Sequence, residues 1–272
     1  MPLLDVPHDR FFLIAGPCVV EGEAVLDETA ATLKQICERL GVPLVFKSSY
    51  RKANRTALSS FTGIGDEAGL ALLAKTGAAY GVPTITDIHA DEDAATAAAY
   101  VDALQIPAFL CRQTSLLLAA GATGLPVSIK KGQFLSPEAM RFAAEKVRSV
   151  RGSEVWLTER GTTFGYQDLV VDFRGIPAMR ATGCPVVMDC THSLQQPNQH
   201  SGVTGGRPAL IETIARAAIA TGADGLFVET HPRPGEALSD GANMLPLGRM
   251  EALLTRLVRL REAVAALDAQ PV

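Results

Sequence analysis

The sequence predicts a single-domain (β/α)8 barrel, the TIM-barrel architecture, over residues 1–272. Two observations predict it: eight short apolar runs alternate with helix-like segments, and most of these runs end in a polar or charged residue. Strands that alternate with helices in this way are parallel, and active sites lie at the carboxyl ends of such strands. An apolar content of 47% in 272 residues is enough for a large core without disulfides.

The expected strands are short apolar runs flanked by glycine, proline or polar residues. They cover residues 11–16, 44–49, 83–88, 103–108, 127–132, 155–161, 186–191 and 225–230. Between them, apolar residues recur with helical spacing in segments rich in Ala, Leu and Glu. These helices are expected at residues 23–40, 66–80, 91–100, 113–120, 137–150, 207–221 and 244–267, with a weaker pattern at 172–182. Glycine follows several of them, as a left-handed helix cap requires.

The longest irregular stretches are residues 51–65, 193–206 and 231–243, each directly after an expected strand. Long loops on the carboxyl face of a barrel usually carry function. Residues 193–206 and 231–243 are therefore predicted to be active-site loops. The first contains three glycines at positions 202, 205 and 206 and is the candidate lid.

Composition excludes several functional classes. A net charge of −4 without runs of Lys or Arg predicts no binding to nucleic acid or to a membrane surface. No apolar stretch approaches the roughly 20 residues that cross a bilayer. Five cysteines at irregular spacings, without a CxxC pair, predict no disulfide framework, and the amino terminus lacks a signal-peptide pattern. We therefore expect a cytoplasmic protein that acts on small molecules.

Positive charge gathers at the ends of the expected strands, in a chain that is acidic overall. Four of the seven lysines and four arginines lie there: Lys47, Lys52, Lys130, Lys131, Arg51, Arg55, Arg112 and Arg160. A cationic mouth of this kind attracts anionic ligands, and Arg binds phosphate or carboxylate in a bidentate manner. We expect substrates with more than one phosphate or carboxylate group. For any single cation, a structural ion pair with Asp87, Glu159 or Asp189 remains an equal alternative.

Four residues that can bind a metal also lie at or just beyond strand ends: Cys18, His192, Glu229 and Asp240. One thiolate, one imidazole and two carboxylates suit a divalent ion such as Zn²⁺, Fe²⁺, Mn²⁺ or Co²⁺. The four meet only if their strands are neighbours. Cys190 is an alternative ligand, because it lies two residues before His192.

Eight motifs in this order resemble the 3-deoxy-D-manno-octulosonate 8-phosphate synthase family. They are AGPC (15–18), FKSSYRKANR (46–55), TDIH (86–89), LQIPAFLCRQT (104–114), KKGQF (130–134), ERGTTFGY (159–166), DCTHS (189–193) and FVETHPRPGEALSDG (227–241). The resemblance extends from about residue 11 to the last helix. It implies an enzyme that condenses phosphoenolpyruvate with D-arabinose 5-phosphate and water and releases phosphate, in lipopolysaccharide inner-core biosynthesis.

The resemblance also implies roles for particular residues. Phosphoenolpyruvate is expected at Lys47, Gln105, Lys130 and Arg160, and arabinose 5-phosphate at Ser49, Lys52, Asn54, Arg55 and Asp87. The expected catalytic residues are Lys47, Lys130, His192 and Asp240. Arg112 matches a position at a subunit boundary, which implies a homo-oligomer, expected to be a tetramer, whose neighbouring subunits complete each site. Cys18 after Gly-Pro implies the metal-dependent class of the family.

Three other functions stay open. The related 3-deoxy-D-arabino-heptulosonate 7-phosphate synthase uses erythrose 4-phosphate on the same barrel, but the Lys-Ala-Asn-Arg-Thr segment at residues 52–56 favours the longer sugar. An aldolase could form an imine at Lys47 or Lys130. A regulatory barrel that binds sugar phosphates without turnover would have gaps in the set of site residues, and the sequence has none.

Overall fold

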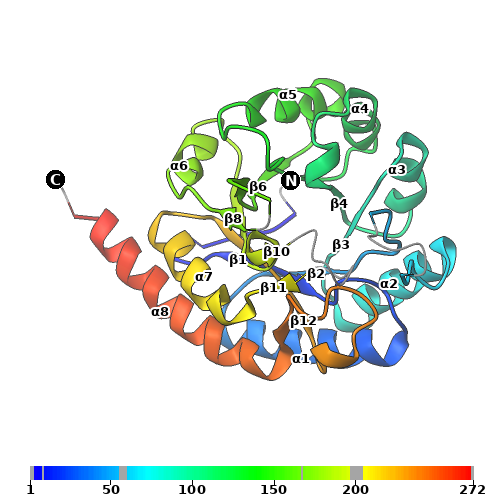
Figure 1. Cartoon of the computed structure of the whole chain (residues 1–272), viewed down its shortest axis with the longest axis horizontal. Coiled ribbons are helices and arrows are strands. Elements are labelled where there is room, and N and C mark those ends of the chain that lie inside the picture. The colour runs from blue at the N-terminus through cyan, green and yellow to red at the C-terminus, as the bar shows by residue number, and fades with distance from the viewer. Residues whose placement is uncertain (1–2, 8, 55–59, 167, 197–204, 271–272) are drawn as a thin grey trace.

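The computed structural model describes residues 3–7, 9–54, 60–166, 168–196 and 205–270. Eight parallel strands form a closed ring in the order β1-β2-β3-β4-β5-β6-β9-β12, and β12 pairs back with β1 (Figure 1). They are β1 (Phe12–Gly16), β2 (Leu44–Lys47), β3 (Thr84–Asp87), β4 (Ala103–Ile106), β5 (Val127–Lys130), β6 (Val155–Glu159), β9 (Val186–Asp189) and β12 (Gly225–His231). The predicted (β/α)8 barrel is confirmed.

Eight α-helices surround the ring in the described part of the chain (Figure 1). They are α1 (Glu23–Leu40), α2 (Asp66–Tyr80), α3 (Asp91–Ala98), α4 (Thr114–Ala122), α5 (Met140–Arg151), α6 (Gly175–Arg180), α7 (Ile211–Ala220) and α8 (Met250–Asp268). The bounds predicted for α1 and α2 are those observed. Both helices end at a glycine with left-handed backbone, Gly41 with φ 64° and Gly81 with φ 61°.

Several predicted helix starts were early, including those at residues 137 and 172, where the helices begin at Met140 and Gly175. Two other early starts lie beside a proline. The helix expected from residue 207 begins at Ile211, after the 3-10 turn Pro208–Leu210. The helix expected from residue 244 begins at Met250, because Leu245–Pro246 forms strand β13 beside β12. Proline disfavours helical backbone in the residue before it, so neither helix extends back through its proline.

Two small hairpins were not predicted. β7 (Thr162–Thr163) pairs with β8 (Leu169–Val170), and β10 (Gln195–Gln196) pairs with β11 (Gly205–Gly206). Two-residue strands are too short to produce a periodic pattern. The second hairpin gives order to both ends of the segment 193–206, which was predicted to be irregular, while residues 197–204 lie outside the described residues.

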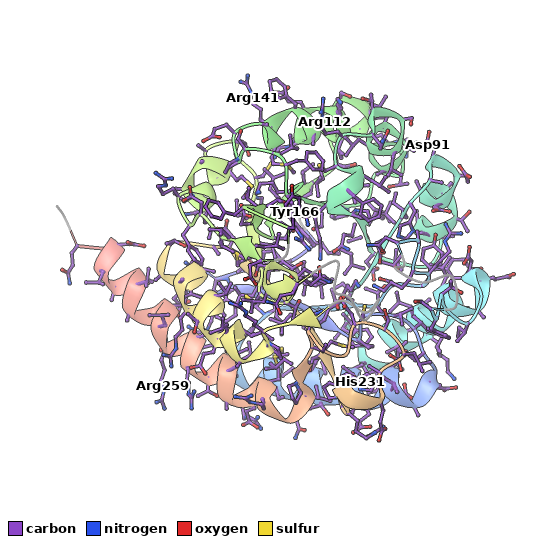
Figure 2. All side chains as sticks on the ribbon, in the orientation of Figure 1. Asp91, Arg112, Arg141, Tyr166, His231 and Arg259 are labelled. Carbon is purple, nitrogen blue, oxygen red and sulfur yellow. The ribbon has the colours of Figure 1, made fainter. Side chains whose placement is uncertain are left out.

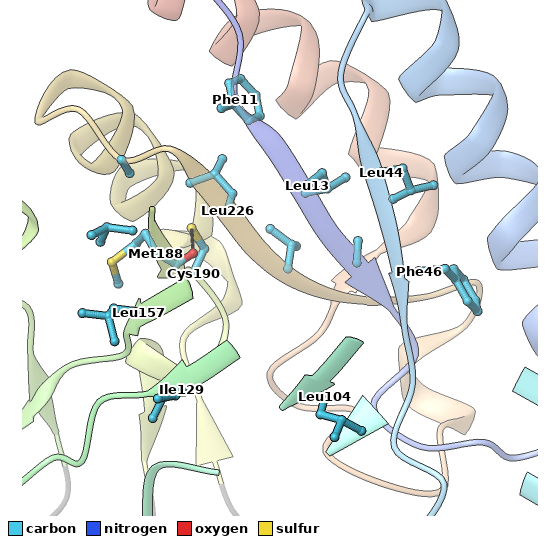
Figure 3. Close-up of a cluster of buried hydrophobic side chains, with 14 of the residues drawn as sticks. Phe11, Leu13, Leu44, Phe46, Leu104, Ile129, Leu157, Met188, Cys190 and Leu226 are labelled. Atoms are coloured by element: carbon cyan, nitrogen blue, oxygen red, sulfur yellow. Dashed lines mark hydrogen bonds between the residues drawn. The ribbon is translucent and has the colours of Figure 1, made fainter. Parts of the chain in front are cut away.

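Strand residues alternate between two hydrophobic clusters. The inner cluster fills the barrel with Phe12, Ile14, Val45, Ile85, Ala103, Trp156, Val187 and Phe227. The outer cluster joins strands to helices and includes Phe11, Leu13, Leu44, Phe46, Ile129, Leu157 and Leu226 (Figure 3). Leu3, Leu4 and Val6 pack against the inner cluster, so the amino-terminal segment lies against the barrel interior. The barrel is therefore a packed core and not a pore.

The contact between β1 and β2 requires glycine at position 16. A Cβ atom there would lie 2.0 Å from the backbone oxygen of Lys47. We expect Gly16→Ala to lower the free energy of unfolding by about 3 kcal/mol or more, because backbone atoms of a closed barrel cannot move apart locally. Urea denaturation followed by circular dichroism measures the change. Gly22→Ala is the control, since a Cβ atom at Gly22 has no neighbour within 4 Å, and equal losses in both variants would contradict the steric argument.

No helix within the described ranges has both the length and the apolar character needed to cross a membrane.

Candidate active site

Along several strands the inner face of the barrel changes from apolar to charged or polar over two residues. Two residues beyond the apolar layer, the inward positions hold Lys47, Asp87, Gln105, Lys130, Asp189 and Glu229, all buried. Because alternate strand residues share a face, these side chains lie directly above Val45, Ile85 and Phe227. The carboxyl end of the barrel is thus a charged layer on an apolar floor.

Lys47 lies at the centre of one half of this layer. Its Nζ donates hydrogen bonds to Glu229 Oε1 at 3.1 Å, Ser49 Oγ at 2.9 Å and the Cys18 carbonyl at 3.2 Å. Asp87 Oδ1 is 4.0 Å from the same ammonium. Burial alone raises the pKa of Asp87, but Lys47 and His89 outweigh it and hold that pKa well below its usual range. Asp87 is therefore a carboxylate at neutral pH.

Lys130 lies in the other half. Its Nζ is 2.6 Å from Asp189 Oδ2, 3.5 Å from His192 Nδ1 and 3.6 Å from the centre of the Phe227 ring. Burial is the main reason that the pKa of Lys130 is lowered, and Lys47 adds to the effect while Asp189 opposes it. Phe227, which the sequence did not single out, therefore supplies the wall beneath this lysine.

Arg160 follows β6 and points along the same inner face. Its Nη2 donates to Gln195 Oε1 at 2.9 Å, and Gln195 Nε2 donates to Asp240 Oδ2 at 2.7 Å. The other guanidinium nitrogen, Nη1, is buried without a partner among the described residues, as is Gln105 Oε1. A buried, unpaired guanidinium nitrogen is costly unless an anion binds it. Gln195 was missed because no motif marks a residue in this loop.

The four predicted metal ligands meet at this end of the barrel. Ligand atoms of Cys18, Glu229 and Asp240 lie within 4.8 Å of one another. His192 completes the group, with Nε2 3.5 Å from Glu229 Oε2 and 3.8 Å from Asp240 Oδ2. The register explains the meeting, because β1 and β12 are neighbours and pair Gly16 with Glu229.

The donor set fits a metal ion. Glu229 Oε2 is buried and has no hydrogen-bond partner in the described part of the chain. Asp189 lies 2.9 Å from His192 Nδ1, which leaves Nε2 directed at the carboxylates, as a metal-binding imidazole requires. Burial alone raises the pKa of Glu229, but His192 and Lys47 outweigh it and lower that pKa to about 2. The site thus holds a free carboxylate oxygen facing an oriented imidazole.

Cys18 must lose a proton before it can bind a metal ion. Burial, with a contribution from Glu229, raises the pKa of its thiol to about 12. The Sγ–H donates to Ser239 Oγ at 3.5 Å. Metal ligation by a thiol requires the thiolate, so binding at this site releases a proton.

Asp240 reaches the site through an unusual backbone. It is the only non-glycine residue with positive φ, 55°, in the described ranges. Asn243 holds it, since Asn243 N donates to Asp240 O at 3.0 Å and Asn243 Nδ2 donates to Asp240 Oδ1 at 2.9 Å. Left-handed backbone outside glycine is uncommon and concentrates at functional sites.

The sugar-side residues are only partly in the described region. Lys52 Nζ donates to Ser49 Oγ at 2.9 Å, so Ser49 accepts from both Lys52 and Lys47. Burial alone lowers the pKa of Lys52, but Cys18, Glu229 and Asp87 outweigh it, and the net shift of that pKa is upward. Asn54 is exposed. Arg55 lies outside the described residues.

Two sequence-based interpretations are corrected. Lys131 is not part of a cationic mouth, because it points to the helix side of the sheet and lies 3.4 Å from Glu159 Oε1, wholly buried. Cys190 is not an alternative ligand, because its side chain belongs to the outer cluster and donates to the Met188 carbonyl (Figure 3). Arg112 lies away from the charged layer of its own barrel and is exposed among the outer helices, so its expected role at a subunit boundary stays a prediction (Figure 2).

Comparisons with known proteins agree on the family to which this chain belongs. The sequence model of the DAHP synthetase I family matches residues 7–266. The chain is 52% identical over 253 residues to the 2-dehydro-3-deoxyphosphooctonate aldolase of Nitrosococcus oceani, covering 93% of this chain and 90% of that protein. It is 50% identical over 258 residues to the protein of the same name from Acidithiobacillus ferrooxidans strain ATCC 53993, covering 95% and 92%.

A third relative of that name, from Synechococcus sp., is 52% identical over 253 residues, covering 93% of this chain and 89% of the relative. The name is a synonym of 3-deoxy-D-manno-octulosonate 8-phosphate synthase, so the resemblance in the motifs is confirmed. The chain belongs to the DAHP synthetase I family, among its members named 2-dehydro-3-deoxyphosphooctonate aldolase.

Proposed function

We propose that this enzyme condenses phosphoenolpyruvate with D-arabinose 5-phosphate and water to give 3-deoxy-D-manno-octulosonate 8-phosphate and phosphate. The product is a precursor of the lipopolysaccharide inner core. The names of relatives at about half identity over nearly the whole chain support this reaction. One structural observation carries the argument: a buried guanidinium with an unpaired nitrogen, two buried lysines and four potential metal ligands share one end of the barrel.

Arg160, Lys130, Gln105 and Lys47 are proposed to bind phosphoenolpyruvate. Arg160 Nη1 and the two ammonium groups offer positive charge to its phosphate and carboxylate, and Arg suits such planar anions because its donors are arranged as a fork. Holding two anionic substrates together converts a bimolecular encounter into a positioned one. The C3 carbon of the enol phosphate then attacks the sugar aldehyde, water adds at C2, and the hemiketal phosphate loses inorganic phosphate.

Lys52, Ser49, Asp87, Asn54 and Arg55 are proposed to bind the sugar phosphate. The carboxylate of Asp87 accepts hydrogen bonds from sugar hydroxyls, and Ser49 already links Lys47 to Lys52 at 2.9 Å on each side. A substrate phosphate at Lys52 would replace the Ser49 hydroxyl as partner of that ammonium. The sugar site would then lie beside the phosphoenolpyruvate site, as the condensation requires.

Cys18, His192, Glu229 and Asp240 are proposed to hold a divalent ion, with Zn²⁺, Fe²⁺, Mn²⁺ and Co²⁺ as candidates. An ion held by these residues would supply Lewis acidity, either toward the aldehyde oxygen or toward the attacking water. Lys47, 3.1 Å from Glu229, offsets part of the negative charge of three anionic ligands. Asp189 keeps the His192 ring in place through Nδ1.

The loops 193–206 and 231–243 are proposed to be active-site loops. The first carries Gln195 and the second carries Asp240, and the two residues are joined by a hydrogen bond of 2.7 Å. Residues 197–204, in the candidate lid, lie outside the described residues.

We further propose a cytoplasmic homotetramer. Five free, buried cysteines suit a reducing compartment. Exposed aromatic side chains follow β4, β5 and β6 and extend onto α5: Phe109, Phe134, Phe142, Phe164 and Tyr166. Aromatic residues are enriched at protein interfaces, and exposed Arg112 lies in the same region (Figure 2).

The choice of aldose tests the reaction against its closest alternative. We expect phosphate release with arabinose 5-phosphate to exceed that with erythrose 4-phosphate by at least about tenfold in kcat/KM, because a site that pairs buried polar groups with substrate hydroxyls disfavours a sugar that lacks one. Both assays use the same metal-loaded enzyme and phosphoenolpyruvate concentration. A preference for erythrose 4-phosphate would assign the chain the heptulosonate 7-phosphate reaction instead.

A further inference from the structure

A second, outward-facing ion pair lies directly behind the two cations proposed to bind phosphoenolpyruvate. Lys131 follows Lys130 along the chain, and Glu159 precedes Arg160. Because neighbouring strand residues point to opposite faces, Lys130 and Arg160 face the barrel interior while Lys131 and Glu159 face the helices. Lys131 Nζ lies 3.4 Å from Glu159 Oε1, and their side chains are 0% and 2% exposed.

Lys131 ties together the loops after β5 and β6. Its ammonium donates to Thr162 Oγ1 at 3.1 Å and to the carbonyl oxygens of Leu135, Gly132 and Gly161 at 3.4, 3.5 and 3.5 Å. Two of these four oxygens belong to residues 132–135 and two belong to residues 161–162. One buried side chain therefore contacts both loops at the points where each leaves the barrel.

Glu159 fixes the backbone on its own side of the pair. Its Oε1 accepts hydrogen bonds from the backbone N–H of Arg160 at 3.0 Å and of Gly161 at 2.7 Å. Its Oε2 lies 3.3 Å from where a Cβ atom at Gly175 would be, so the carboxylate packs against the start of α6. The Glu159 carboxylate therefore holds the backbone N–H of Arg160, whose side chain faces the barrel interior.

Stability alone does not account for such a pair. Replacing a buried ion pair by neutral groups of similar volume is often neutral or stabilising, since both charges lose their hydration on burial. Buried charges fix the local backbone and side-chain geometry, because the hydrogen-bond donors and acceptors around them are all satisfied in only one arrangement. Here the pair fixes the direction in which the side chains of residues 130 and 160 leave the backbone.

We propose that Lys131 and Glu159 are positioning residues that set the side-chain directions of Lys130 and Arg160, and through them the affinity for phosphoenolpyruvate. The inference rests on the proposed function. Neither residue touches substrate in this scheme, because both lie on the helix side of the strands. A displacement of about 1 Å at a substrate-binding cation is enough to reduce the rate by up to a hundredfold.

The double variant Lys131→Met with Glu159→Gln tests the inference. It removes both charges and keeps the approximate volume, so no unpaired buried charge is left to unfold the protein. We expect phosphoenolpyruvate binding, measured by calorimetry, to weaken at least about tenfold, the KM for arabinose 5-phosphate to change by less than about threefold, and the thermal midpoint to stay near that of the wild type.

Val147→Ala is the matched control. It removes buried volume from α5 outside both loops and is expected to lower the thermal midpoint without changing phosphoenolpyruvate affinity. Unchanged phosphoenolpyruvate affinity in the folded double variant would overturn the positioning role. So would equal increases in the KM values of both substrates. The single variant Glu159→Asp, which keeps the charge, is expected to retain more affinity than Glu159→Gln.

The measurements distinguish a wrong positioning role from a wrong assignment of the reaction. If the wild-type enzyme releases phosphate from the two substrates, the reaction holds whatever the double variant does. If the wild type shows no turnover, calorimetric titration of phosphoenolpyruvate alone still measures the effect of the Lys131–Glu159 pair.

Discussion

Chelation of the divalent ion is expected to reduce phosphate release from phosphoenolpyruvate and arabinose 5-phosphate by about a hundredfold or more, and adding a divalent ion back is expected to restore it. A metal ion contributes several kcal/mol of transition-state stabilisation, and each 1.36 kcal/mol is about tenfold in rate. The basis is the cluster of Cys18, Glu229 and Asp240 within 4.8 Å, with His192 beside it. Elemental analysis of the same samples measures how much metal is lost.

Two cysteine variants make this prediction specific. Cys18→Ala removes a proposed ligand and is expected to lower metal content and activity together. Cys190→Ala removes an equally buried thiol that faces the outer cluster, and is expected to leave metal content unchanged. Full turnover in stripped enzyme would contradict the assignment. Trapping of a lysine by borohydride, with activity insensitive to chelation, would instead support an imine-forming aldolase.

Cys18→Asn tests whether the condensation needs the metal ion. If the variant no longer binds metal but still condenses the two substrates, the ion is dispensable for forming the bond, and the lysines and Arg160 supply the essential charge. We expect the variant to lose most of its activity, because Asp240 and Glu229 would then face each other and His192 without a cation. Phosphate release and metal content are measured on the same preparation.

Arg160→Met is expected to lower kcat/KM for phosphoenolpyruvate by about a hundredfold or more. Truncating one partner of a buried charge pair costs about 2–5 kcal/mol, and each 1.36 kcal/mol is about tenfold. The pair proposed here is the guanidinium with the substrate anion, since Arg160 has an unpaired buried nitrogen and its only side-chain hydrogen bond in the described region is to Gln195. Steady-state kinetics with each substrate varied in turn measure the loss.

Two further arginine variants control this experiment. Arg160→Lys keeps the positive charge but not the fork of donors, so we expect only partial recovery. Arg174→Met removes an exposed arginine that pairs with Asp172 at 2.7 Å in the chain leading to α6, and kcat/KM is expected to stay within about twofold of the wild type. If Arg160→Met bound phosphoenolpyruvate normally, the anion site would have to be assigned to other cations.

The sequence was sufficient to predict the barrel because its signal is local and repeated. Each strand is an apolar run, each helix has its own spacing, and glycines such as Gly41 and Gly81 mark where helices end. Errors fell at the ends of elements, several of them near proline, and in hairpins too short for any periodic pattern, such as Gln195–Gln196 with Gly205–Gly206.

The meeting of the four candidate metal ligands was predicted for a related reason. Charged residues at the ends of parallel strands must lie on one face, so Cys18 and His192 could be expected together although 174 positions separate them in the numbering. Side-chain direction was harder to predict. Lys131 was grouped with Lys130, yet one step along a strand reverses the face, and the structure places it in an ion pair with Glu159.

The sequence by itself determined the type of fold, the face that carries the chemistry and most of the residues gathered there, because periodicity and strand-end charge are properties of neighbours along the chain. Only the tertiary structure decided which of those charges meet. The left-handed backbone of Asp240, the Gln195 bridge to Arg160 and the outward pairing of Lys131 depend on loops packed against each other. Contacts between loops leave no periodic trace in the order of the residues, since they depend on distances fixed only when the barrel closes.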